Sequence, residues 1–182
     1  MTTWFFNPFT YIAGFKSLVI GWIIILVTAC IAYYSHTHFD GAIDAHLHAG
    51  NKMYPAWHYV AEPFIDWSSL VLVFFITGRI FSISTVRFID IAGTFAFTRW
   101  PFFFLALINF LAPETKDLSH ISLQLLFFAF VSLGFCIWMI ALMYNAFRVS
   151  ANIKGSKSVW LFIISLIVAE MISKIILHYT LH

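Results

Sequence analysis

The chain has 182 residues, of which 62% are hydrophobic and only 10% are charged. Soluble domains are typically about 45–50% apolar and about 25% charged, so this composition excludes an ordinary soluble protein and indicates one that sits in a lipid bilayer. The net charge of +2, spread along the chain, argues against nucleic acid as a partner. Cys30 and Cys136 both lie in apolar runs, so neither is interpreted as half of an extracellular disulfide.

The N-terminal stretch, residues 3–15, is aromatic but short, and Pro8 interrupts it. Aromatic rings favour the headgroup zone of a bilayer, which predicts a short interfacial helix here. The alternative is that these residues form the first turns of a longer spanning helix. The sequence leaves both interpretations open.

Five longer apolar runs follow, each long enough to cross about 30 Å of hydrocarbon as a helix. They cover residues 17–34, 63–81, 89–112, 122–146 and 158–177. We therefore predict an all-α, polytopic membrane protein with five transmembrane helices, in which residues 1–182 form a single membrane domain.

The connections between these runs sort by charge. One side carries Lys16, Arg79, Arg87, Arg148, Lys154 and Lys157, and the other carries only Lys52 and Lys116. By the positive-inside rule, the N-terminus is cytoplasmic and the C-terminus lies outside. This topology places all eight histidines on the outer side.

The first outer loop, residues 35–62, is dense in imidazole and carboxylate groups. These are ligands that zinc and similar divalent ions accept, and the His-x-His spacing places two rings on one side of an extended chain. One hypothesis is therefore a divalent metal site, with zinc as the favoured ion. The other is a solvated loop that merely connects two helices. The candidate ligands are His36, His38, Asp40, Asp44, His46, His48 and His58.

Arg99 lies near the middle of the third run, where an isolated arginine costs at least about 2.5–3.5 kcal/mol and needs a partner. Glu170 reaches a similar depth in the fifth run and is the predicted counter-ion. Lys174 follows Glu170 by four residues, which offers that carboxylate a second partner. Asp90, close to Arg87, is expected at the inner interface. The contact of Arg99 with Glu170 is interpreted either as a relay or as a structural pair that fixes helix register.

Three stretches carry a family resemblance: NPFTYIAG, FIDIAGTFAFTRWPFF and MYNAFRVSANIKGSKSVWLFIISLI. They resemble segments of YIP-type integral membrane proteins. The resemblance implies a five-helix membrane domain with a cytoplasmic N-terminus. Eukaryotic members are Golgi and ER trafficking proteins that associate with Rab-type GTPases, and bacterial members have no settled activity to carry over. The chain departs from the eukaryotic pattern, which has a long soluble N-terminal region, so the resemblance does not carry over a GTPase partner.

Two function hypotheses follow, and they leave open whether the chain is an enzyme. The first is a YIP-like, non-enzymatic scaffold or transport-related protein of a bacterial plasma (inner) membrane, built around an Arg99–Glu170 contact. Its partners are the lipid bilayer and either other membrane proteins or further copies of the chain. The second is an outward-facing metal-binding protein or metal-dependent hydrolase that uses the loop 35–62. There a metal would activate a bound water, with Glu62 or Asp66 as the general base.

Overall fold

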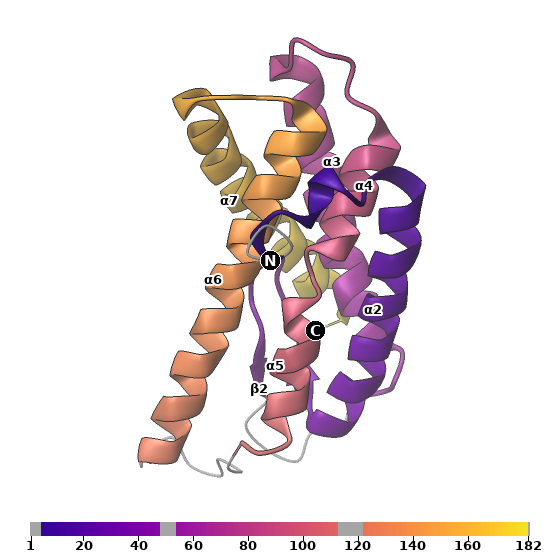
Figure 1. Ribbon diagram of the computed structural model, residues 1–182. Coiled ribbons are helices and arrows are strands. Elements are labelled where there is room, and N and C mark those ends of the chain that lie inside the picture. The colour runs from indigo at the N-terminus through magenta and orange to yellow at the C-terminus, as the bar shows by residue number, and fades with distance from the viewer. Residues whose placement is uncertain (1–4, 48–53, 113–121, 182) are drawn as a thin grey trace.

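The computed structural model describes residues 5–47, 54–112 and 122–181. These ranges contain five stretches that are long and apolar enough to cross a membrane as helices, which confirms the predicted all-α architecture (Figure 1). They are α2 (Gly14–Ser35), α3 (His58–Phe81), the consecutive α4 (Phe88–Phe97) and α5 (Pro101–Asn109), α6 (Leu123–Ala151) and α7 (Ser156–Leu181). Large apolar side chains are exposed along these helices, as expected for surfaces that face lipid. The chain is therefore an integral membrane protein.

Helix α2 packs closely along α4, and glycines make this approach possible. A Cβ atom added to Gly21 would lie 2.5 Å from the backbone carbonyl carbon of Ala96, and one added to Gly93 would collide with the carbonyl oxygen of Gly14. Ser17 lies in the same interface, where its hydroxyl donates a 3.0 Å hydrogen bond to the carbonyl of Gly93. Small residues of this kind allow the backbones of neighbouring membrane helices to come into contact.

This contact makes a prediction with a matched control. Gly21→Ala should lower the midpoint of thermal unfolding in detergent, since the added methyl meets backbone that cannot move aside, and overpacking costs about 1–3 kcal/mol. Gly134→Ala places the same methyl where nothing lies within 4 Å, among the described residues, and should leave the midpoint unchanged or raise it. Equal shifts for the two variants would contradict the close α2–α4 contact.

The third run, predicted as one helix over residues 89–112, is divided into α4 and α5 by a turn at residues 98–100. Pro101 explains the division, because its ring nitrogen carries no hydrogen and cannot bond to the carbonyl of Phe97. The amide of Trp100 bonds to that carbonyl instead, at 3.3 Å. Arg99 therefore lies in a break between two half-helices.

The connection from α2 to α3 folds back into the bundle. His36 adopts a left-handed conformation with φ of 53° and ends α2. The antiparallel strands β1 (Thr37–His38) and β2 (His46–Leu47) follow, joined by a tip at residues 39–45 (Figure 1). Phe39 and Ala42 are fully buried. The interpretation of this segment as a merely solvated connection is therefore wrong for residues 37–43, and we call residues 36–47 the re-entrant loop.

The N-terminal segment is an element of its own, which excludes the alternative that it forms the first turns of α2. It contains the short 3-10 helix η1 (Pro8–Thr10). Side chains of α6 bind its backbone: the indole of Trp138 donates to the carbonyl of Phe5 at 2.9 Å, and the amide of Asn145 donates to the carbonyl of Phe6 at 2.8 Å. The segment is thus fixed against α6, and its position relative to the headgroups stays a prediction.

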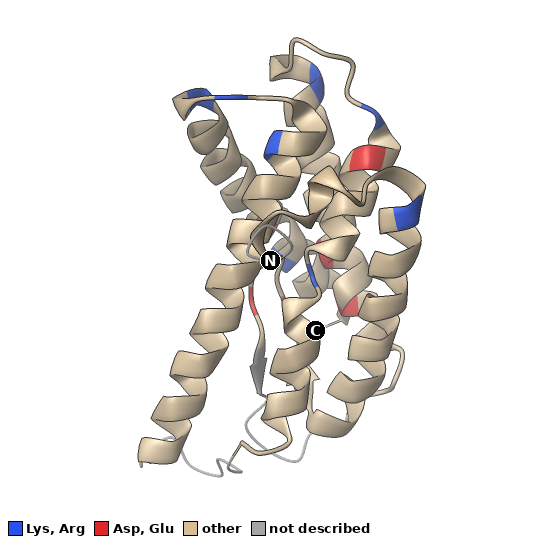
Figure 2. Ribbon diagram, viewed as in Figure 1, with Lys and Arg blue, Asp and Glu red and all other residues tan. Residues whose placement is uncertain are grey.

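Basic residues gather at one end of the bundle, where α2 starts and α3 and α6 end (Figure 2). Asp90 lies at this end too, with its carboxylate 3.7 Å from the guanidinium of Arg87. The opposite end, where α2 ends and α3 begins, carries His36 and His58, and we call it the histidine end. Which end faces the cytoplasm stays a prediction. The basic end is defined by Lys16, Arg79, Arg87, Arg148, Lys154 and Lys157.

Candidate functional site

The partner of Arg99 is Asp66 of α3. The guanidinium Nη2 donates to the Asp66 carboxylate at 2.8 Å, with the two side chains 2% and 0% exposed. The predicted pairing of Arg99 with Glu170 is wrong. Helix α3 starts at His58 rather than at Pro63, so Asp66 lies about 12 Å into the helix instead of in its first turn. That depth brings it level with the break that holds Arg99.

Arg99 and Asp66 also join two further elements. The second guanidinium nitrogen, Nη1, donates to the carbonyl of Ala42 in the re-entrant loop at 3.2 Å. The other carboxylate oxygen of Asp66 accepts a short, 2.5 Å hydrogen bond from the buried hydroxyl of Ser173 on α7. The ion pair thus ties together α3, α7, the α4–α5 break and the loop. Buried charges are tolerated when they are paired and hydrogen-bonded in this way.

Glu62 anchors the base of the re-entrant loop. One carboxylate oxygen lies 2.8 Å from Nδ1 of His38, and the other accepts the backbone amide of Phe39 at 3.0 Å. Both side chains of the Glu62–His38 pair are buried. Glu62 and Asp66 thus each have both carboxylate oxygens engaged in contacts within the protein. Their proposed catalytic role stays a prediction.

The tip of the loop lies against Glu170 and Lys174 of α7. The Glu170 carboxylate accepts the backbone amide of Ile43 at 3.0 Å, and Lys174 lies 3.6 Å from the same carboxylate, which confirms the predicted pair within α7. Lys174 also binds Asp44 at 2.8 Å, and these two side chains are 50% and 38% exposed. Gly41 fits here because a Cβ atom would collide with the carboxylate of Glu170.

The predicted metal ligands are distributed over different contacts. His36 is exposed at the end of α2, His38 is bound to Glu62, and Asp44 is bound to Lys174. His58 is buried in the first turn of α3. Within residues 5–47, 54–112 and 122–181, no group of three or more His, Cys, Asp or Glu side chains is placed to hold a metal ion.

The remaining predicted ligands are Asp40, His46 and His48. Asp40 is half-buried near the tip of the loop. The side chain of His46 and the whole of His48 lie outside the described residues. Zinc binding by this loop therefore stays a prediction.

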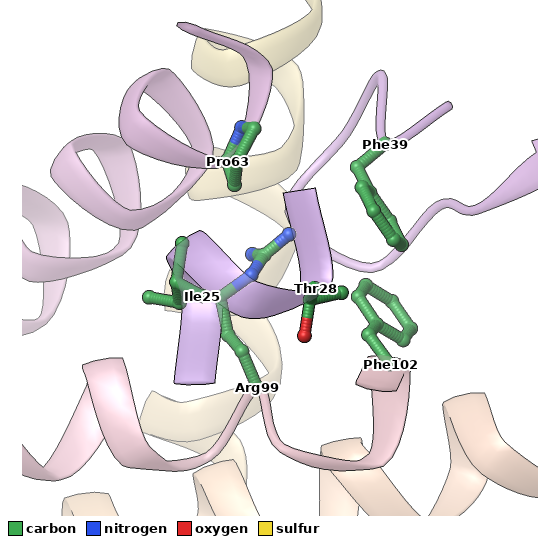
Figure 3. A pocket seen from close by; sticks show the side chains of 6 residues that line it. All are labelled: Ile25, Thr28, Phe39, Pro63, Arg99 and Phe102. Atoms are coloured by element: carbon green, nitrogen blue, oxygen red, sulfur yellow. The ribbon is translucent and has the colours of Figure 1, made fainter. Parts of the chain in front are cut away.

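A small cavity lies beside the guanidinium of Arg99 (Figure 3). Its volume is about 10 Å³, room for about one water molecule. The hydroxyl of Thr28 is buried here and has no hydrogen-bond partner in the described part of the chain. The cavity therefore offers polar groups to a water but no space to a larger solute. Its lining consists of Ile25, Thr28, Phe39, Pro63, Arg99 and Phe102.

Sequence reasoning missed Ser173, the break at Arg99 and the inward path of the loop. The break had a signal in Pro101, two residues after Arg99. Ser173 had only a weak one, because single serines in apolar helices usually serve helix packing.

The arrangement as a whole is a set of hydrogen-bonded ionisable side chains inside a helical bundle, covered by a loop from the histidine end. Ionisable groups at membrane depth are rare and typically mark pathways for ions, protons or substrates. No protein-family model, curated protein or solved structure matches the chain.

Proposed function

We propose that this chain is a non-enzymatic, transport-related membrane protein in which the re-entrant loop gates the passage of protons from the histidine end. One observation carries the proposal: the backbone of the loop tip is hydrogen-bonded to ionisable side chains inside the bundle. The carbonyl of Ala42 accepts from Arg99, and the amide of Ile43 donates to Glu170. The YIP-like character and the bacterial plasma membrane remain part of the proposal on the sequence motifs alone.

Transport accounts for these features better than a scaffold role does. A scaffold can hold its helices together by apolar packing, whereas buried ion pairs are expensive to assemble. Non-helical backbone at membrane depth is tolerated only inside protein or along a water-filled cavity. Broken helices that meet ionisable side chains at such a place are typical of secondary transporters. The α4–α5 break at Arg99 and the loop tip supply this combination.

Protons fit the dimensions of the site. The cavity beside Arg99 has a volume of about 10 Å³, which leaves no room for a larger solute in this conformation. Protons need only hydrogen-bonded groups and single waters. Carboxylates and hydroxyls in contact provide such groups, as at Asp66 and Ser173.

The two attachments of the loop differ in strength. At its base, the Glu62–His38 contact is buried. At its tip, the Lys174–Asp44 pair is 50% and 38% exposed, and exposed ion pairs contribute only about 0–1 kcal/mol. The Lys174–Asp44 pair is therefore the weakest of these attachments, and its loss favours detachment of the tip while the base stays fixed. Detachment also breaks the hydrogen bonds of Ala42 with Arg99 and of Ile43 with Glu170. Detachment would connect the histidine end with Arg99 and Asp66.

Proton entry into proteoliposomes tests this function. The vesicles enclose a pH-sensitive dye, and a potassium gradient with valinomycin supplies the driving potential. We expect wild-type protein to exceed protein-free vesicles, and Lys174→Gln to raise the initial rate up to about fivefold, the equivalent of about 1 kcal/mol in loop opening. Lys154→Gln removes the same charge at the basic end and is the matched control.

A scaffold role predicts a different result. Wild-type and Lys174→Gln vesicles would then both take up protons no faster than protein-free vesicles. That outcome would overturn the transport proposal.

A further inference from the structure

Each of the five spanning stretches has a basic residue where it reaches the basic end. Lys16 lies in the first turn of α2 and Lys157 in the first turn of α7, and Arg87 immediately precedes α4. Arg79 and Arg148 lie in the last turns of α3 and α6. The cations are therefore distributed over every spanning stretch of the bundle, and not gathered in one connection (Figure 2).

The protein itself neutralises little of this charge. All six basic residues of the basic end are exposed. Among the described residues, Arg87 alone of the six lies within ion-pair distance of a carboxylate, that of Asp90 at 3.7 Å. The ammonium of Lys157 contacts the carbonyl of Phe81 at 3.4 Å and lies 5.4 Å from the centre of its ring, and neither group carries a charge. Six cations thus face one carboxylate.

Helix stability does not explain three of these cations. The N-terminus of a helix carries a partial positive charge and the C-terminus a partial negative one, so a basic side chain stabilises the last turn and opposes the field of the first. Arg79 and Arg148 have the favourable position. Lys16, Arg87 and Lys157 have the unfavourable one. Their placement points to a negative charge outside the chain.

An aromatic side chain accompanies each of these three cations, and all three rings are more than half exposed. An exposed ring at the end of a spanning helix lies where hydrocarbon meets the headgroups. A cation beside it is then level with the lipid phosphates. A soluble polyanion, by contrast, offers no apolar layer for the rings. The pairs are Phe15 with Lys16, Phe88 with Arg87, and Trp160 with Lys157.

We propose that the basic end binds the headgroups of anionic phospholipids, and that Lys16, Arg87 and Lys157 contact their phosphates. Basic residues beside spanning helices attract anionic headgroups by a factor of about five each, the equivalent of about 1 kcal/mol. The predicted cytoplasmic position of this end fits the proposal, because the cytoplasmic leaflet carries anionic lipids. The inference is independent of the proposed function, which concerns the re-entrant loop at the opposite end.

Spin-labelled lipids test this preference directly. In phosphatidylcholine vesicles that contain the protein, electron spin resonance measures the fraction of a labelled lipid that is held at the protein surface. Labelled phosphatidylglycerol should associate with the wild-type protein up to about fivefold more strongly than labelled phosphatidylcholine. The difference should disappear in about 1 M salt, where the screening length is about 3 Å.

Charge removal assigns the preference to the three cations. The Lys16→Gln/Arg87→Gln/Lys157→Gln variant should lose most of it, and Lys16→Gln alone should lose part. Lys174→Gln is the matched control for the single variant, because it removes a lysine that binds Asp44 in the re-entrant loop, and it should keep the full preference. In detergent without anionic lipid, the triple variant should unfold at the wild-type temperature or above, since its cations opposed the helix fields.

Three results would overturn the inference. The first is equal association of the two labelled lipids with the wild-type protein, which is expected if the basic residues act only in setting the topology during insertion. The second is a triple variant that folds and keeps the full preference. The third is displacement of labelled phosphatidylglycerol by inorganic phosphate at constant ionic strength, which would assign the basic end to a soluble anion. If the triple variant does not fold, the two single variants decide.

Discussion

Asp66→Ala is expected to lower the free energy of unfolding by about 3–5 kcal/mol, because it leaves the guanidinium of Arg99 buried without its carboxylate. The hydroxyl of Ser173 loses its acceptor as well. Unfolding in mixed detergent micelles, followed by circular dichroism, measures the change. Asp44→Ala is the control, because its pair with Lys174 is exposed and should contribute less than about 1 kcal/mol.

A double variant shows whether the lower free energy of unfolding comes from the Asp66–Arg99 pair itself. Asp66→Ala/Arg99→Met removes both charges and keeps an apolar side chain of similar length in place of the arginine. Replacement of a buried pair by apolar residues is often neutral or stabilising, so the double variant should recover much of the loss. A double variant that is as unstable as the sum of its single variants would contradict the contact.

Glu62→Ala is expected to release the base of the re-entrant loop. It leaves the amide of Phe39 and the ring of His38 without the carboxylate that each one contacts, at about 1–3 kcal/mol for each buried group. We expect a lower free energy of unfolding and faster maleimide labelling of Ala42→Cys, whose position is fully buried in the wild type. The free Cys30 and Cys136 are first replaced by serine.

Glu62→Gln provides the comparison for this change. Its side-chain oxygen can still accept one of the two hydrogen bonds, so labelling at residue 42 should lie between wild type and Glu62→Ala. Labelling that is equally slow in all three proteins would mean that Glu62 does not hold the loop.

The spanning helices were predictable because a bilayer permits few backbone conformations. Backbone groups in hydrocarbon must bond within their own segment, so a long apolar run forms a helix. The first residue of a helix that is preceded by polar residues is harder to predict, as α3 shows. Its first turns contain His58 and Glu62, whose composition is typical of a loop. Both are buried, and Glu62 binds His38 of the re-entrant loop.

The pairing of Arg99 was not predictable in the same way. Position along an apolar run gives the depth of a side chain in the bilayer, but it does not say which neighbouring helix that side chain faces. Glu170 has a suitable depth and yet binds the amide of Ile43. Asp66 is the partner of Arg99. It reaches the depth of Arg99 because α3 begins at His58, before the start of its apolar run.

The inward path of the loop depends on contacts far away in the sequence. Ala42 binds Arg99, 57 residues later, and Ile43 binds Glu170, 127 residues later. A polar stretch with several histidines gives no local sign of burial, because its partners lie on helices that appear later in the chain. Gly41, which fits against the Glu170 carboxylate, is the residue whose type reflects the docking.

The long separation of these contacts along the sequence has a consequence for biosynthesis. A ribosome completes the loop about 130 residues before it reaches Lys174, to which Asp44 binds. While the chain is still being inserted, Glu62 can already bind His38 at the base of the loop, whereas Asp66 enters the bilayer before Arg99 and Ser173 have been synthesised. A nascent chain that stops before α7 therefore has Glu62 and Arg99 to hold its loop, but it lacks Glu170 and Lys174, the partners of Ile43 and Asp44 at the tip.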